Sequence, residues 1–253
     1  MGTPTSTDRR HGDLISANPG TPCHSVYAPR MARPNVEPTP PRLPTELPSH
    51  ADFRLAGNAD LYRLTVQGDF TDANLPEMTV EESRLLHSAF VGADLGRLRL
   101  VDVVVEGSDF SGADLQEASF TRVAFSSCRM SGALFGRAHL QDVTFSDSKL
   151  DGVSLRMCEG DRVVFDHVNL RGSDLYAAHL TSARFFDCDL YGTDVSQAVL
   201  PRARFHGSLL SDIKGGEYLR DIVIESSQVL PLATRVFSAL GIGVDDEREA
   251  PNS

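Results

Sequence analysis

The chain has 253 residues, of which 41% are hydrophobic, and a formal net charge of −11. This acidic balance argues against direct nucleic-acid binding, because phosphate contacts require a surplus of Lys and Arg. Apolar runs stay short of the ~20 residues of a membrane span, and the first thirty residues lack the apolar segment of a signal peptide. Four cysteines are too few for a disulfide scaffold. We therefore expect a cytoplasmic protein without membrane contact.

Residues 1–50 form a proline-rich N-terminal segment. They contain ten of the fourteen prolines, including those of the run Glu37-Pro38-Thr39-Pro40-Pro41-Arg42-Leu43-Pro44. Such a composition buries too little apolar surface to offset the entropy of ordering the chain, so this segment is predicted to be disordered. Met31 is an alternative start of the protein, in which case the preceding residues would be absent from it.

A five-residue repeat follows. From Phe70 to Leu210 every fifth residue is apolar, with the single exception of Gly160. The residue two positions earlier is mostly small, as at Ala73, Ala93 and Ala113. A period of five matches neither an α-helix nor a flat strand, so each repeat must contain a turn.

Units such as Ala73-Asn74-Leu75, Ala93-Asp94-Leu95 and Ala113-Asp114-Leu115 resemble the pentapeptide-repeat family. The consensus of that family is Ala, then Asp or Asn, then Leu, with two variable residues. The resemblance implies an all-β fold, a right-handed quadrilateral β-helix with four pentapeptides per coil. In that fold the central residue and the residue two before it point inward.

A second period, of twenty residues, supports four units per coil independently. Glycines recur at residues 92, 112, 132, 152, 172 and 192, each two positions after a central residue. Glycine at a corner suggests a backbone angle that a side chain would hinder. With this period, the central residues Phe125, Phe145, Phe165, Phe185 and Phe205 are predicted to stack in one ladder. About seven coils at ~4.8 Å spacing give a rod roughly 35 Å long.

The repeat register sets the expected domain limits. The β-helix is assigned to residues 51–214, and Leu61 and Val66 fall one residue out of register, which indicates a slipped first coil. Residues 215–241 are assigned to a C-terminal cap in which 227–240 form a helix that Gly241 ends. Residues 242–253 are expected to be a disordered acidic tail.

Two features of the predicted core stand out. Cys128, Cys158 and Cys188 occupy the small inward position and are expected to be core fillers, since free cysteine is commonly buried. Gly160 replaces a large central residue without breaking the register. A local bend or repacking by Met157 is the favoured explanation, and a ligand pocket is the alternative.

The sequence offers no catalytic constellation. His139, Glu159 and His179 fall in one outward column at twenty-residue spacing, and two imidazoles with a carboxylate can bind a metal. Outward positions tolerate many polar residues, however, so we expect no metal, no cofactor and no enzymatic activity. An enzyme that uses this column is retained only as an alternative.

Surface acidity is the remaining functional signal. Asp94 and Asp114 form one outward stretch, and Asp174 and Asp194 form another; residues 51–214 contain 24 acidic and 16 basic residues. The resemblance implies a partner-binding protein, since family members resemble duplex DNA and bind DNA gyrase, a type II topoisomerase. Duplex DNA of the same length carries on the order of twenty charges, so the mimicry would be partial. A protein-interaction scaffold with another partner is the alternative.

The C-terminal helix is a candidate for self-association. Its apolar residues at helical spacing are Val229, Leu232, Val236 and Leu240. The resemblance implies dimers joined through a C-terminal element. We therefore expect these four residues either to join two copies of the chain or to cover the end of the core.

Overall fold

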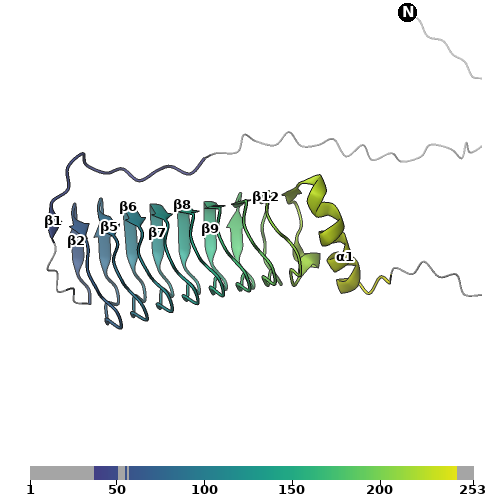
Figure 1. Cartoon of the computed structure of the whole chain (residues 1–253), viewed down its shortest axis with the longest axis horizontal. Coiled ribbons are helices and arrows are strands. Elements are labelled where there is room, and N and C mark those ends of the chain that lie inside the picture. The colour runs from purple at the N-terminus through teal and green to yellow at the C-terminus, as the bar shows by residue number, and fades with distance from the viewer. Residues whose placement is uncertain (1–36, 51–54, 56, 244–253) are drawn as a thin grey trace, which may run out of the picture. The chain divides into compact units, whose positions relative to one another are not determined.

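The computed structural model describes residues 37–50, 55 and 57–243, all within the compact unit Asn35–Ser253. It is a β-solenoid of about eight coils with an α-helix at its C-terminal end. Figure 1 shows the coils following one another from β2 to the helix. The predicted fold class is thereby confirmed. The alternative start at Met31 and most of the predicted acidic tail lie outside the described residues.

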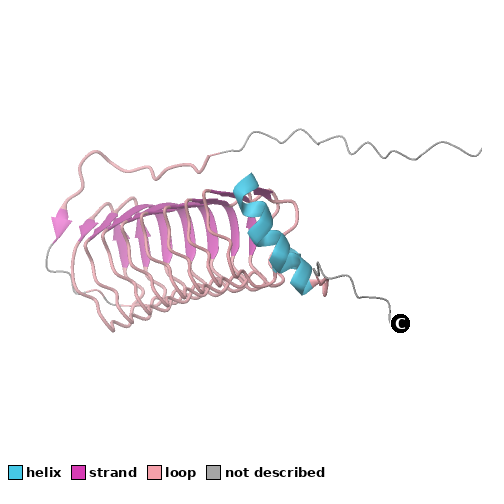
Figure 2. Cartoon of the chain, turned by 45° about the vertical axis from the view of Figure 1, so that its right-hand side comes forward, coloured by secondary structure: helices cyan, strands magenta, loops and turns pink. Residues whose placement is uncertain are grey.

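The strands form one sheet in which each pairs in parallel with the strand of the next coil. Between β6 and β9 the paired residues are twenty apart, as in Leu100 with Phe120, so one coil contains four pentapeptides. The strands are β1 (Ser49–His50), β2 (Asp60–Tyr62), β3 (Thr65–Val66), β4 (Thr79–Glu81), β5 (Arg84–Leu86), β6 (Arg99–Glu106), β7 (Ser119–Ser126), β8 (His139–Ser146), β9 (Glu159–Asp166), β10 (His179–Thr181), β11 (Arg184–Phe186), β12 (Arg204–His206) and β13 (Val223–Ile224). Figure 2 shows them stacked along one side of the solenoid.

The interior is a set of side-chain ladders. The predicted phenylalanine stack is present: ring centroids of Phe125 and Phe145 are 4.9 Å apart, and those of Phe145 and Phe165 are 5.2 Å apart. The stack continues through Phe185 to Phe205 at 4.9 and 4.6 Å, with the rings nearly parallel throughout. Stacking rings at the coil spacing fills this side of the core without voids, which favours a close-packed interior.

Left-handed backbone angles turn the chain at the corners. The six glycines of the predicted column have φ between 62° and 71°, as expected. Other corners adopt the same conformation with ordinary residues, for example Asp102 and Arg122, both at φ 54°. A side-chain Cβ atom placed at Gly112, Gly132, Gly152, Gly172 or Gly192 would have no neighbouring atom within 4 Å. Glycine there therefore relieves backbone strain and is not required for space.

Gly160 does not open a pocket in the core. A Cβ at Gly160 would lie 2.8 Å from Leu180 Cδ2 and 2.9 Å from Val163 Cγ2, so these two side chains already fill the space. Met157, the residue expected to repack here, points to solvent and is 41% exposed. The expectation of repacking therefore holds, but Met157 was the wrong residue. Val163 lies three residues further along β9 and Leu180 lies in the next coil, and both already point inward; on the outer side Gly160 lines an open hollow.

The first coil is slipped as predicted. Leu61 pairs with Val80 and Val66 with Leu85, so their offset is nineteen residues instead of twenty. Both residues remain buried, at 4% and 0% exposure. This coil is part of the sheet and lengthens the solenoid beyond the seven coils expected.

Residues 37–48, here called the strap, lie against the solenoid. β1 pairs with β3 at the strap's C-terminal end, and the backbone N–H groups of Thr39 and Arg42 donate to carboxylates of later coils. In Figure 1 the strap runs back past β6 and β8. The prediction of disorder up to residue 50 is therefore wrong for 37–50, because partners far along the chain order a segment whose own composition would leave it unfolded.

The C-terminal cap contains a last strand and three helical segments. β13 pairs with β12, which extends the sheet into the region assigned to the cap. After it come the short 3₁₀ helix η2 (Ser226–Gln228) and, directly, helix α1 (Val229–Ala239), while the 3₁₀ helix η1 (Gly216–Tyr218) precedes β13. Leu232 is buried and Val236 packs on the core, so α1 covers the open end of the solenoid.

Candidate partner-binding surface

One outward residue of each coil, lying just before a central residue and twenty residues from the next, forms a single column along the solenoid. Parallel bridges join Asp94 to Asp114, and Asp174 to Asp194. The same chain of bridges runs between the two pairs through Leu134 and Ser154. The two acidic stretches expected from the sequence are thus parts of a single column, here called the acidic column, with an uncharged gap of two coils.

Each aspartate of the acidic column also stabilises a turn. Its Oδ1 accepts the backbone N–H two residues later, at 3.1 Å for Asp94, 2.9 Å for Asp114, 2.9 Å for Asp174 and 2.8 Å for Asp194. Short polar side chains favour this local hydrogen bond. The carboxylates are therefore held in fixed positions, and the turn alone already accounts for Asp or Asn at this place in the repeat.

The four aspartates differ in how much of their charge is available. Asp174 forms an ion pair with Arg156 at 2.7 Å, and the guanidinium of Arg156 lies 4.4 Å from the ring centroid of Tyr176. Among the described residues no ion pair involves Asp94, Asp114 or Asp194. Asp194 lies between Asp174 and the basic Lys214 in the same column, and its charge also acts on Arg156, so the unbalanced negative charge of the column is greatest at Asp94 and Asp114.

Corner charges elsewhere alternate and neutralise one another. Arg97 pairs with Glu77, and Arg137 lies 3.9 Å from Glu117, along one corner. The next corner, here called the ion-pair corner, consists of Asp102, Arg122, Asp142 and Arg162. Each of these ion pairs takes up one acidic and one basic residue, so the acidic surplus is carried by carboxylates outside them.

The ion-pair corner was missed by the sequence analysis. Arg162 Nε and Nη2 donate to Asp142 Oδ1 and Oδ2 at 2.6 and 2.9 Å, and Arg122 binds Asp102 in the same bidentate way at 2.7 and 2.5 Å. These hydrogen bonds hold the pKa of both aspartates below the ordinary value. The detectable signal was alternation of acid and base at a spacing of twenty.

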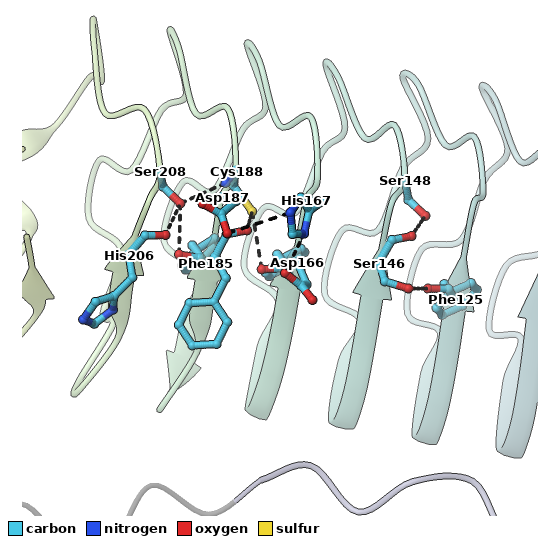
Figure 3. Close-up of polar contacts among 12 residues, drawn as sticks. Phe125, Ser146, Ser148, Asp166, His167, Phe185, Asp187, Cys188, His206 and Ser208 are labelled. Atoms are coloured by element: carbon cyan, nitrogen blue, oxygen red, sulfur yellow. Dashed lines mark hydrogen bonds and ion pairs between the residues drawn. The ribbon is translucent and has the colours of Figure 1, made fainter.

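His139, Glu159 and His179 line one open hollow on the outer wall with Gly160, but within the described residues their ligand atoms do not form a metal-capable group. His139 Nδ1 lies 3.5 Å from Glu159 Oε2 on an open wall, and both side chains are well exposed. In the described part of the chain the metal-capable group is a different one, Asp166, His167 and Asp187. There His167 Nδ1 lies 2.9 Å from Asp166 Oδ1, so hydrogen bonding already accounts for the cluster (Figure 3).

The cysteines occupy the inward positions that were expected. Cys128, Cys158 and Cys188 are unpaired thiols and are buried. Burial raises the pKa of the Cys128 thiol to about 11 and that of the other two to about 12. The backbone N–H of Cys188 donates to Ser208 Oγ at 3.0 Å (Figure 3). Thiolate chemistry is strongly disfavoured at such sites, which fits a packing role.

The four apolar helix residues differ in burial along the length of α1. Leu232 and Val236 face the core, whereas Val229 and Leu240 are 52% and 60% exposed. Their spacing still places all four on one face of the helix, but only its middle part lies on the core and both ends reach solvent. A second apolar surface, here called the helix patch, consists of Val229, Leu230, Phe237, Leu240 and Ile242, all exposed.

The fold and its surfaces define a β-solenoid that presents ordered columns of side chains on its outer walls. A family model described as pentapeptide repeat region matches residues 118–195, and one described as pentapeptide repeats (8 copies) matches 88–123 and 178–213. The chain belongs to the pentapeptide repeat protein family. No curated protein matches it.

Solved structures with similarity to the chain include the full-length plasmid-mediated fluoroquinolone resistance protein QnrB1, with 18% identity over 77% of this chain and 100% of that one, at a TM-score of 0.31. HetL, from the cyanobacterium Nostoc sp. strain PCC 7120, has 16% identity over 66% and 87%, at a TM-score of 0.23. A thylakoid-lumen protein of Arabidopsis thaliana has 22% identity over 51% and 74%, at 0.20. Likenesses at this level carry no functional inference.

None of the helices in the described residues has the length and apolarity that crossing a membrane requires.

Proposed function

We propose that the protein is a non-catalytic binding rod whose acidic column contacts a basic surface of a protein partner. The observation that carries this proposal is the fixed geometry of Asp94 and Asp114, whose carboxylates are held by turn hydrogen bonds and form no ion pair among the described residues. Side chains that are already held in position lose little entropy on binding, so a partner with complementary charge binds them more tightly and associates faster.

A type II topoisomerase such as DNA gyrase is the specific partner we propose to test first. Its basic DNA-binding surface is complementary to neighbouring negative charges one coil, ~4.8 Å, apart, as Asp94 and Asp114 are. The acidic surplus of residues 51–214 supports this choice, although it is smaller than the charge of a duplex of equal length. Such a partner places the protein in the cytoplasm. A scaffold that uses the same column for another partner is the second candidate.

The test of the topoisomerase proposal is a gyrase supercoiling assay with purified protein. We expect inhibition at micromolar concentration, weakened at least about fivefold by Asp94→Asn with Asp114→Asn, because these changes remove two column charges. Asparagine keeps the Oδ1 acceptor of each turn, so the fold should be retained.

A matched control removes the same charge from the neighbouring column. Asp69 and Asp109 accept the same turn hydrogen bond, at 3.0 and 2.9 Å, and Asp69→Asn with Asp109→Asn should leave inhibition unchanged. If the wild type neither inhibits gyrase nor protects it from a quinolone, gyrase is not the partner. Equal loss in both variants would show that the acidic column has no special role.

We propose in addition that the helix patch joins two copies of the chain. We expect the wild type to be a dimer and Leu230→Asp with Phe237→Asp to be a folded monomer, because the charges enter an apolar interface while Leu232 still covers the core. Size-exclusion chromatography with light scattering measures this, and Thr234→Asp, on an exposed polar site, is the control. A monomeric wild type at the highest concentrations would contradict the proposal.

A further inference from the structure

One outward column of the solenoid is covered and largely apolar. The column consists of Val104, Ala124, Thr144, Val164 and Arg184. Each of these residues comes two positions after the ion-pair corner and directly before an inward central residue, which from Phe125 onward belongs to the phenylalanine stack. Val164 is 8% exposed and Arg184 is 4% exposed, and Val104, Ala124 and Thr144 are half-buried, so the cover is most complete at the last two coils of the column. Outward side chains of a solenoid are ordinarily solvated, so this covered column requires a cover.

The strap is that cover, and it is held through its backbone. The N–H of Thr39 donates to Asp142 Oδ1 at 3.0 Å, and the N–H of Arg42 donates to Asp102 Oδ1 at 2.9 Å. Both carboxylates are buried, at 5% and 7% exposure. At the far end, Glu37 forms an ion pair with Arg184. Hydrogen bonds to charged acceptors are among the stronger ones, so two of them fix the position of the strap.

The spacing of these contacts matches an extended polyproline conformation. Thr39 and Arg42 are three residues apart, which spans about 9.3 Å in a polyproline II helix. Asp102 and Asp142 are two coils apart, which spans about 9.6 Å. The two residues between the donors are Pro40 and Pro41, which have no N–H to leave unsatisfied. Between Thr39 and Arg42 the strap therefore presents no backbone donor that the solenoid leaves without an acceptor.

We propose that the covered column and the ion-pair corner form a binding site for an extended proline-rich peptide with two backbone donors three residues apart, and that residues 37–48 occupy it as an internal ligand. The arginines hold the aspartates ionised and oriented, the column supplies the apolar floor, and the coil repeat sets the register. The site lies on a different wall from the acidic column. Release of the strap would therefore expose a second recognition surface that is independent of the proposed topoisomerase contact.

The test uses the full chain with Thr39→Pro and Arg42→Pro, which removes both donors and keeps the strap extended. A fluorescein-labelled peptide with the native sequence of residues 37–48 should bind this variant saturably, as measured by fluorescence anisotropy. The wild type should bind it at least about tenfold more weakly, because its own strap competes at high effective concentration. Circular dichroism confirms that the variant is folded.

Two controls isolate the backbone contacts. A full chain with Thr39→Ala and Arg42→Ala keeps both N–H groups and should behave like the wild type. A peptide that carries the two proline substitutions should not bind the released variant. Failure of the native peptide to bind that variant, or equal binding of both peptides, overturns the proposal.

A second measurement needs no substitution. In the wild-type chain, hydrogen exchange should find the amides of Thr39 and Arg42 protected at least about tenfold more than that of Glu46, which lies in the same strap but has no acceptor among the described residues. Equal, fast exchange at all three amides would show that the strap is not held. Neither result depends on whether gyrase binds.

Discussion

Phe165→Ala is expected to lower the free energy of unfolding by about 3–5 kcal/mol, the range for deleting a large buried aromatic side chain. Phe165 is fully buried and stacks on Phe145 at 5.2 Å and on Phe185 at 4.9 Å. Removing the middle ring leaves a void that the neighbouring rings cannot fill, because their own coils hold them at the sheet spacing. Urea unfolding followed by circular dichroism measures the loss.

The same position provides the control for this prediction. Phe165→Leu introduces a residue that other central positions use, and it should cost only about 1–1.5 kcal/mol. Because each coil of a solenoid contacts only its neighbours, hydrogen exchange should accelerate mainly in the coils on either side of Phe165. An Ala variant as stable as the Leu variant would contradict a tightly stacked core.

Asp142→Ala is expected to cost about 2–3 kcal/mol, because it removes one member of a buried ion pair and leaves Arg162 less well paired. The side chain of Asp142 is 6% exposed, and it accepts two hydrogen bonds from Arg162 and one from the strap. Breaking it should therefore destabilise the corner and free the N-terminal part of the strap together. Urea unfolding and hydrogen exchange of Thr39 report the two effects separately.

Asp161 offers a matched control on the same guanidinium. Asp161 also pairs with Arg162, but its side chain is 45% exposed, so Asp161→Ala should cost less than about 0.5 kcal/mol, as for other solvated ion pairs. Similar losses at Asp142 and Asp161 would mean that burial does not strengthen the corner.

The contribution of Asp142 should also depend on pH in one direction. Its pKa in the folded chain is below the ordinary value of 3.8, chiefly through the hydrogen bonds from Arg162. The stabilisation is therefore complete above about pH 4 and is lost as the pH falls through the lower folded pKa. The stability difference between wild type and Asp142→Ala should shrink only in that acidic range.

The acidic column shows how far a periodic sequence can predict a site. Its members and their outward direction were predictable, since position in the repeat decides both. That Asp94 and Asp174 share one column was also available from their spacing, which is four coils, but the two pairs were treated separately. The sequence did not show which carboxylates remain unpaired, because the ion pair of Asp174 depends on the side-chain rotamer by which Arg156 reaches it from a neighbouring coil.

The sequence alone determined the solenoid, its inward ladders and the slipped first coil, because these follow from local turns repeated every five and twenty residues, and it determined the cap helix through apolar residues at helical spacing. Tertiary structure decided the rest. Leu180 and Val163, instead of Met157, compensate for Gly160; α1 divides its apolar residues between core and solvent; and the strap is ordered by carboxylates 60 and 103 residues away. The repeat pattern places these residues in the fold, but it does not determine which side-chain conformation fills a gap, how far the helix overhangs the core, or where a segment outside the repeat binds.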